Sequence, residues 1–62
     1  MKYSLKELRA RINKTQSEVA NDLGISTATY NSWEKDLSNV AISKVVALAQ
    51  YFNVNLSEIK IR

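Results

Sequence analysis

TQSEVANDLGISTATYNSWE, residues 15–34, contains two short helical patterns joined by Gly24, which is the one glycine of the chain. Thr15 precedes Glu18 by three positions, the spacing of a capping box, in which each side chain accepts a hydrogen bond from the other residue's backbone N–H. Gly24 provides the positive φ angle that commonly ends a helix. We therefore predict a helix that begins after Thr15 and ends at Gly24.

The second pattern begins at Ser26, whose hydroxyl is suited to cap the next helix. Tyr30 and Trp33 lie three positions apart, which predicts one narrow stripe of this helix packed in the core. Its remaining surface carries short and mostly polar side chains, which are Thr27, Ala28, Asn31 and Ser32. Threonine and asparagine are mediocre helix formers, so helix propensity does not explain their presence. This helix therefore has the surface expected of a binding element.

Three more helices are predicted from apolar residues repeated at helical spacing. Their predicted buried positions are Leu5, Leu8 and Ile12 in the first helix, Ile42, Val45, Val46, Ala49 and Phe52 in the fourth, and Leu56 and Ile59 in a short fifth. The fold class is therefore all-α, with five helices.

Capping residues mark the ends of these helices. Ser4 with Glu7, and Asn55 with Glu58, have the spacing of further capping boxes. Asn13 and Asn53 follow the first and fourth helices, and asparagine tolerates the left-handed backbone conformation almost as well as glycine. Asn39 is the candidate cap of the fourth helix.

The composition limits the classes of function. The 62 residues, with a net charge of +3, predict one small domain spanning residues 1–62. The chain has no cysteine and no histidine, which argues against disulfides, imidazole catalysis and common zinc sites. We expect no cofactor, no small-molecule ligand, and no membrane-spanning or signal segment, and so predict a cytoplasmic protein. A complete protein and the DNA-binding piece of a longer regulator are both consistent with the sequence.

The sequence resembles the Cro and phage-repressor type of helix-turn-helix domain over roughly residues 5–59. The residues that carry the resemblance are Arg9, Thr15, Gln16, Glu18, Ala20, Gly24, Ile25, Ser26, Trp33, Glu34, Leu48 and Ala49. The resemblance implies a compact, lambda-repressor-like bundle of five helices, with the helix-turn-helix at about residues 16–35. It also implies an ion pair between Arg9 and Glu34, although Arg9 is alternatively a solvated charge.

The family's DNA-binding geometry places the second helix of this motif in the major groove. The expected base-contacting residues are Thr27, Ala28, Asn31 and Ser32. Asn31 has an amide suited to adenine, and the methyl groups of Thr27 and Ala28 suit the thymine methyl. The family's long Gln, Arg or Lys base readers are missing at Thr27 and Ala28, which favours close helix approach, bridging water or DNA shape as part of the recognition.

Phosphate contacts are expected first from Gln16, because the N-terminus of a helix attracts anions. Further candidates at the edges of the same face are Lys14, Thr29, Lys35 and Lys44. For each lysine, a solvated charge without a ligand is an equally good interpretation.

One such module covers little DNA, so the expected partner is a palindromic double-stranded operator bound by a homodimer. Tyr3 and Tyr51 are interpreted as surface or dimer residues. The alternating ending, residues 59–62, is interpreted as a frayed terminus or, less simply, as an arm that joins a second subunit.

The sequence thus predicts a DNA-binding transcriptional regulator of the phage or mobile-element repressor type. The alternative is a module that uses the same scaffold to bind a protein, as an antitoxin-like regulator does. An enzyme is the weakest hypothesis, because four of the six acidic residues already have capping or pairing roles.

Overall fold

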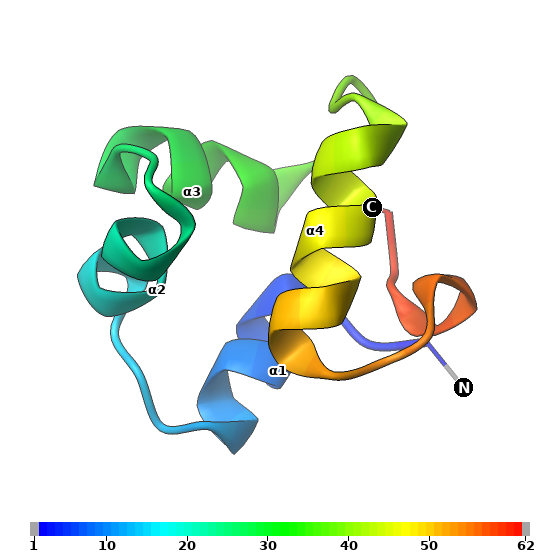
Figure 1. Ribbon diagram of the computed structural model, residues 1–62, viewed down its shortest axis with the longest axis horizontal. Coiled ribbons are helices and arrows are strands. Elements are labelled where there is room, and N and C mark those ends of the chain that lie inside the picture. The colour runs from blue at the N-terminus through cyan, green and yellow to red at the C-terminus, as the bar shows by residue number, and fades with distance from the viewer. Residues whose placement is uncertain (1, 62) are drawn as a thin grey trace.

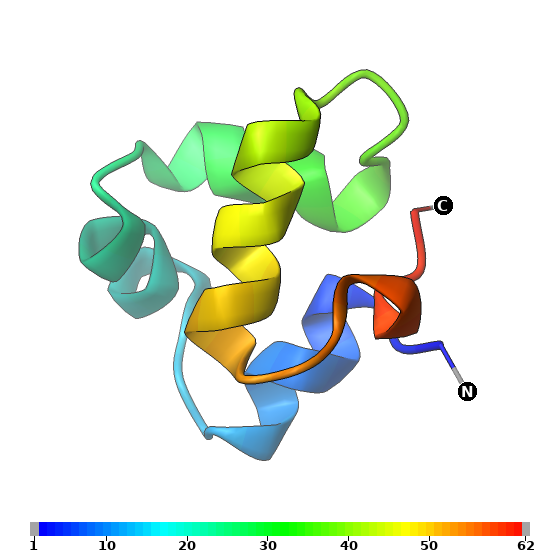
Figure 2. The same cartoon turned by 45° about the vertical axis from the view of Figure 1, so that its right-hand side comes forward.

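A computed structural model describes residues 2–61 as four α-helices and one final turn of 3-10 helix (Figure 1). Their bounds are α1 Leu5–Arg11, α2 Gln16–Leu23, α3 Thr27–Lys35, α4 Ile42–Phe52 and η1 Leu56–Glu58. Helix α4 lies in the middle, with the other helices arranged around it in both views (Figures 1 and 2). The predicted all-α class is confirmed. The fifth element is a 3-10 turn rather than an α-helix, because only three residues separate Asn55 from the extended Ile59.

The predicted helix starts are present wherever the sequence has a capping box. Glu18 N–H donates to Thr15 Oγ1 at 3.1 Å, and Thr15 N–H donates to Glu18 Oε1 at 2.8 Å. An equivalent box joins Ser4 with Glu7. At η1, Asn55 N–H donates to Glu58 Oε1 at 2.9 Å, whereas Glu58 N–H donates to the backbone oxygen of Asn55. These local bonds satisfy backbone donors that have no partner inside the helix.

Left-handed residues end three helical segments, as predicted. Gly24 has a φ of 73°, Asn13 of 55° and Asn53 of 57°. An added Cβ at Gly24 would meet no other atom within 4 Å, so the backbone angle alone favours glycine there.

The start of α4 differs from the prediction. Ala41 is the cap residue and provides no side-chain hydrogen bond, whereas Asn39 lies in the preceding turn. That turn is closed by hydrogen bonds from Ser38 N–H to Asp36 Oδ1 and from Val40 N–H to Leu37 O. The turn fixes the direction of the chain before the helix begins.

Two predicted core residues of α4 lie outside the core. Ile42 is 66% exposed and Val46 is 37% exposed. The buried residues of the helix are instead Val45, Leu48, Ala49 and Phe52. Including Leu48 shifts the centre of the buried stripe, so that Ile42 and Val46 fall at its margin.

Ile12 and Leu56 are also more exposed than predicted. Ile12 is 40% exposed, because α1 ends at Arg11 and the chain turns away at Asn13. Leu56 is 41% exposed, because the 3-10 turn buries none of its own residues and the core contact is made by Ile59, which follows the turn. The buried residues are Leu5, Leu8, Val19, Ala20, Tyr30, Leu37, Val45, Leu48, Ala49, Phe52 and Ile59, while Trp33 packs partly buried against them.

The two ends of the described chain pair with each other. Tyr3 and Ile59 form a parallel β-bridge, in which Tyr3 N–H donates to Glu58 O and Lys60 N–H donates to Tyr3 O, both at 2.7 Å. Leu37 N–H donates to Ile61 O at 2.8 Å. Figure 2 shows both termini on one side of the molecule. Residues 59–61 are therefore neither frayed nor extended away from the domain, and Arg62 lies outside the described residues.

Candidate nucleic-acid interface

Helices α2 and α3 are joined by a tight turn around Gly24. Gly24 N–H donates to Asn21 O at 3.2 Å, and Ile25 N–H donates to Ala20 O at 3.0 Å, so the end of α2 is closed by its own backbone. Ser26 Oγ then accepts from Thr29 N–H at 3.1 Å and starts α3. The turn thus fixes the direction of α3 relative to α2, as Figure 1 shows.

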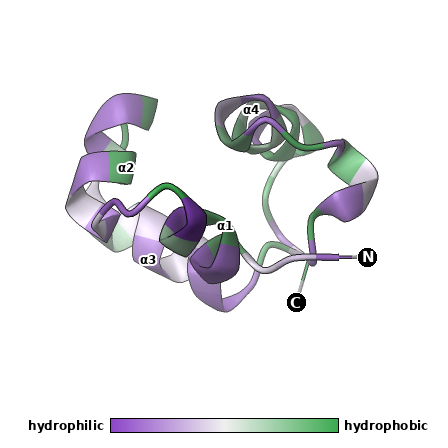
Figure 3. Cartoon of the chain, turned by 90° about the horizontal axis from the view of Figure 1, so that it is seen from below, coloured by the Kyte–Doolittle hydropathy of each residue, from purple (hydrophilic) through white to green (hydrophobic). Residues whose placement is uncertain are grey.

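Helix α3 has one side in the core and one side outside. Tyr30 is fully buried, and Trp33 and Glu34 are partly buried. At about 100° per residue, the opposite side carries a continuous set of residues, which we call the outer stripe: Thr27, Ala28, Asn31, Ser32 and Lys35. Asn31 is half-buried, and the other four are exposed. Figure 3 shows mostly neutral to hydrophilic colours along α3. All four predicted base-contacting residues therefore lie on one accessible face.

One hydroxyl group of the outer stripe has its proton directed toward the protein. Ser32 Oγ donates to Ala28 O at 3.2 Å, and since a hydroxyl has only one proton, its oxygen presents acceptor lone pairs outward. Thr27 Oγ1 makes only a weak contact with Ser17 Oγ, at 3.5 Å, in which either hydroxyl can donate.

An ion pair lies directly behind the outer stripe. Arg9 Nε donates to Glu34 Oε2 at 2.7 Å, and the two side chains are only 20% and 8% exposed. Arg9 Nη1 also donates to Lys14 O at 2.9 Å. The pair therefore fastens α3 to α1 and to the connection that leads into α2.

The ionised form of Glu34 is held by its neighbours. Burial disfavours its charge, but hydrogen bonds from Arg9 and Gln16 keep the pKa of Glu34 below its ordinary value. The hydrogen bond to Glu34 in turn raises the pKa of Arg9. Tyr30 lies beside this pair with a buried hydroxyl that makes no hydrogen bond to any of residues 2–61, and burial raises the pKa of Tyr30. Tyr30 therefore remains protonated.

Gln16 links the ion pair to the outer stripe. Its Nε2 donates to Glu34 Oε1 at 2.8 Å, and its Oε1 accepts from Asn31 Nδ2 at 3.2 Å. Sequence reasoning placed Gln16 at the start of α2 as a phosphate contact but did not find its connection to Asn31. No local pattern reveals that connection, because the two residues are brought together only by the α2–α3 packing.

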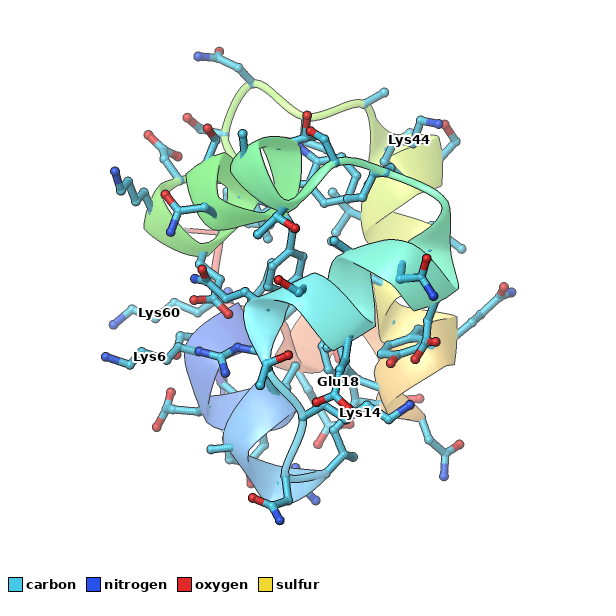
Figure 4. All side chains as sticks on the ribbon, turned by 90° about the vertical axis from the view of Figure 1, so that its left-hand side faces the viewer. Lys6, Lys14, Glu18, Lys44 and Lys60 are labelled. Atoms are coloured by element: carbon cyan, nitrogen blue, oxygen red, sulfur yellow. The ribbon has the colours of Figure 1, made fainter. Side chains whose placement is uncertain are left out.

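Lys14 is held at a distance from the outer stripe. Its Nζ lies 2.7 Å from Asp22 Oδ2 and 5.9 Å from the centre of the Tyr51 ring. Hydrogen bonding to Asp22, then to Tyr51, raises the pKa of Lys14. Figure 4 labels Lys14 at the connection that leads into α2. The charge of Lys14 is thus largely compensated within the protein.

Tyr51 is a packing residue rather than a free surface residue. Its ring meets Phe52 edge to face, with 4.9 Å between ring centres, and its hydroxyl donates to Asp22 Oδ2 at 2.6 Å. Tyr3, the other tyrosine predicted at the surface, is partly buried, and the guanidinium carbon of Arg11 lies over its ring, 5.2 Å from the ring centre. Each tyrosine therefore has an intramolecular role.

The other phosphate candidates lie at different positions. Lys35 belongs to the outer stripe, whereas Thr29 lies on another side of α3, where its Oγ1 accepts from Ser26 Oγ at 2.9 Å. Lys44 is exposed on α4. In Figure 4 it lies opposite Lys6 and Lys60, which project together from the other side of the molecule.

Residues 2–61 lack two features of other functional classes. No group of three or more His, Cys, Asp and Glu side chains in this part of the chain is arranged to hold a metal ion. Within the same range, none of the helices has the length and apolar character needed to cross a membrane.

Two short helices joined by a glycine turn, with the second exposing a polar stripe, define the helix-turn-helix class of protein. The family model described as helix-turn-helix matches residues 5–59, and the chain therefore belongs to this family. This match confirms the family resemblance seen in the sequence.

Two relatives carry names that describe regulators. A transcriptional repressor, RstR of the cryptic phage CTXphi from Vibrio cholerae, is 31% identical over 55 residues, which are 89% of this chain and 50% of the relative. An uncharacterized HTH-type transcriptional regulator from Archaeoglobus fulgidus is 33% identical over 59 residues, covering 95% of this chain and 83% of the relative. The chain spans about half the length of the Vibrio repressor. No solved structure matches the chain.

Proposed function

We propose that the protein is a sequence-specific regulator of transcription that binds double-stranded DNA by inserting α3 into the major groove. The outer stripe is the observation that carries this proposal. Apart from Lys35 at the end of the helix, its side chains are short enough to let the helix backbone come close to the bases, and the groove, about 12 Å wide, admits a helix. The two relatives named as transcriptional regulators support the same function.

Three kinds of base contact suit the outer stripe. The Asn31 amide pairs with adenine, which presents one acceptor and one donor in the major groove. The methyl groups of Thr27 and Ala28 contact the methyl group of thymine. The outward lone pair of Ser32 accepts from an amino group of cytosine or adenine.

Phosphate contacts are proposed for residues at the borders of this face. Gln16, at the start of α2, and Lys35, at the end of α3, lie on its two sides, and Lys44 on α4 is a further candidate. Lys14 and Thr29 are weaker candidates, because Lys14 Nζ is paired with Asp22 and Thr29 lies on another side of α3. Gln16 bonds to Glu34 and Asn31 but keeps a second Nε2 hydrogen for a phosphate. A single module of this kind covers roughly 600–1,000 Å² of DNA, so two copies on a palindromic operator are the expected form. By its similarity to the phage protein, we assign the regulator to the repressor type.

The test is selection of bound duplexes from a random pool, followed by titration of the selected duplex against salt. We expect one enriched short motif with two-fold symmetry and a linear fall of log affinity with log salt concentration. The matched control is the same duplex with its base order shuffled, which should bind more weakly at every salt concentration. Absence of any enriched motif would refute sequence-specific binding.

A second candidate function rests on α4. Ile42 and Val46 are exposed apolar residues four positions apart, so they lie on one side of the helix. Such a surface favours the alternative of a partner-binding, antitoxin-like regulator. A complex that forms with a protein partner and is lost in Ile42→Ser, without any enriched DNA motif, would support this alternative over the first.

A further inference from the structure

We propose that Glu34 determines base specificity without touching DNA, because it fixes, through Gln16, the orientation of the Asn31 side-chain amide. We call Glu34, Gln16 and Asn31 the amide relay. This inference rests on the proposed function, since it concerns how the outer stripe reads a base. It assigns Glu34 and Gln16 as positioning residues for Asn31.

The first step of the relay is set by charge. An ionised carboxylate only accepts hydrogen bonds. Glu34 Oε2 already accepts from Arg9 Nε at 2.7 Å, and the pair is largely shielded from water. Gln16, at 2.8 Å from Glu34 Oε1, must therefore turn its amide nitrogen toward the carboxylate. The reverse orientation would place two oxygen acceptors against each other in a partly buried site.

The second step follows from the geometry of the glutamine amide. Once Nε2 of Gln16 faces Glu34, its Oε1 is available for Asn31 and can only accept. Asn31 must then turn Nδ2 toward Gln16, and the two atoms lie 3.2 Å apart. The direction of both hydrogen bonds therefore depends on the charge of Glu34.

The consequence concerns the groups that Asn31 has left for DNA. One N–H is used by Gln16, so Oδ1 and the second N–H remain as one acceptor and one donor. Adenine presents the complementary pair, an acceptor at N7 and a donor at N6. If the Asn31 amide turned over, its NH₂ group would face the groove, where guanine presents two acceptors at N7 and O6. The relay therefore favours adenine over guanine at the base pair that Asn31 contacts.

A purely structural role for Glu34 makes a different prediction. If the carboxylate only supports the packing of α3, its replacement weakens binding to all duplexes by a similar factor. If it orients Asn31, its replacement changes the preference between adenine and guanine at one position. Base preference at that position therefore separates the two roles.

The experiment compares binding to two versions of the selected duplex, with adenine or guanine at the position contacted by Asn31. That position is identified as the one whose preference disappears in Asn31→Ala. We expect about tenfold or greater discrimination by the original protein, the size typical of a good amide–base pair. Glu34→Gln should lose or reverse this discrimination, because Arg9 can only donate and would hold the new amide oxygen, which leaves its NH₂ group facing Gln16. In the Asn31→Ala background, Glu34→Gln should cause no further change in base preference.

Two further variants keep the test decisive. Gln16→Met breaks the relay but leaves the Arg9–Glu34 pair in place, so it should also lose the discrimination even if Glu34→Gln folds poorly. Asp22→Asn is the matched control, because it neutralises another hydrogen-bonded carboxylate outside the relay. It should retain the base preference. If folded Glu34→Gln and Gln16→Met both keep the original discrimination, the inference is overturned.

A measurement without DNA separates this inference from the proposed function. In the free protein, NMR spectra should show the Gln16 side-chain NH₂ group exchanging more slowly with water than the same group in Glu34→Gln. Equal exchange would refute the relay, whatever the protein binds. Slow exchange together with no enriched DNA motif would instead refute the proposed function and leave the relay as a feature of the fold.

Discussion

Lys14 and Tyr51 share one acceptor, Oδ2 of Asp22, with Lys14 Nζ at 2.7 Å and the Tyr51 hydroxyl at 2.6 Å. This arrangement joins the α1–α2 connection, α2 and α4. Lys14 must therefore break its ion pair with Asp22 before its ammonium group can bind a phosphate. Lys35, on the outer stripe, makes no ion pair among the contacts described for residues 2–61, so it can approach a phosphate without first breaking one.

The salt dependence of DNA binding should therefore distinguish these two lysines. Lys35→Met should reduce the slope of log affinity against log salt by about one, the effect of removing one phosphate contact. Lys14→Met should leave the slope nearly unchanged. Both slopes are measured with the selected duplex under identical buffer conditions. A larger change for Lys14 than for Lys35 would contradict this assignment.

The left-handed end of α4 gives a prediction about stability. Asn53→Ala should lower the free energy of unfolding by roughly 1 kcal/mol, because alanine tolerates a φ of 57° poorly. Asn53→Gly should cause no loss, since glycine adopts this angle freely. Denaturation in urea measures both. Asn39→Ala is the control and should change stability by less than about 0.5 kcal/mol, because Asn39 lies in a turn and does not cap α4. A larger loss in this control would restore Asn39 as the cap.

The position of the core on α4 is tested by truncating two of its residues. Leu48→Ala should cost roughly 2–5 kcal/mol, because it leaves a cavity where the side chain is fully buried. Ile42→Ala should cost less than about 0.5 kcal/mol, because Ile42 is mostly exposed. Thermal or urea unfolding measures both changes. Similar losses for the two variants would place Ile42 in the core after all.

The charge of Glu34 predicts how stability depends on pH. The pKa of Glu34 is lowered in the folded protein from its ordinary value of 4.5. Its contribution to stability is therefore fully present above pH 4.5 and is lost as the pH falls through the folded-state pKa. Glu7 and Asp22 also have lowered pKa values and act in the same direction. We expect the stability of Glu34→Gln to fall less steeply below pH 4.5 than that of the original protein. An unchanged slope would mean that Glu34 titrates alike in both states.

The capping boxes and the left-handed helix ends of this fold could be predicted from the sequence. A capping box needs two residues three positions apart, and a left-handed end needs one asparagine or glycine, so each is visible in a few letters. The starts of α1, α2 and α3, and the end residues Asn13 and Asn53, were therefore predicted correctly.

The errors occurred where burial depends on neighbours distant in the chain. Helical periodicity gives the relative positions of Ile42, Val46 and Leu48, but not where the stripe is centred. Ile12 is exposed because α1 ends beside it, and Leu56 is exposed because it begins a 3-10 turn that buries none of its own residues.

The candidate site was predicted only in part. The exposed residues of α3 and the presence of Arg9 opposite Glu34 followed from helical spacing and from family resemblance. The bond between Gln16 and Asn31, and the engagement of Lys14 by Asp22, depend on tertiary packing. Such contacts carry no signal in a single sequence.

The bridge between Tyr3 and Ile59 has a consequence for the order of folding. Its two residues lie almost a full chain length apart, so closing it costs more chain entropy than closing the local α2–α3 turn. We expect the groove-binding half of the molecule to assemble before the ends meet. Loosening the packing at this junction, for example with Ile59→Val, which removes one buried methyl group beside the bridge, should accordingly speed unfolding and leave the folding rate almost unchanged.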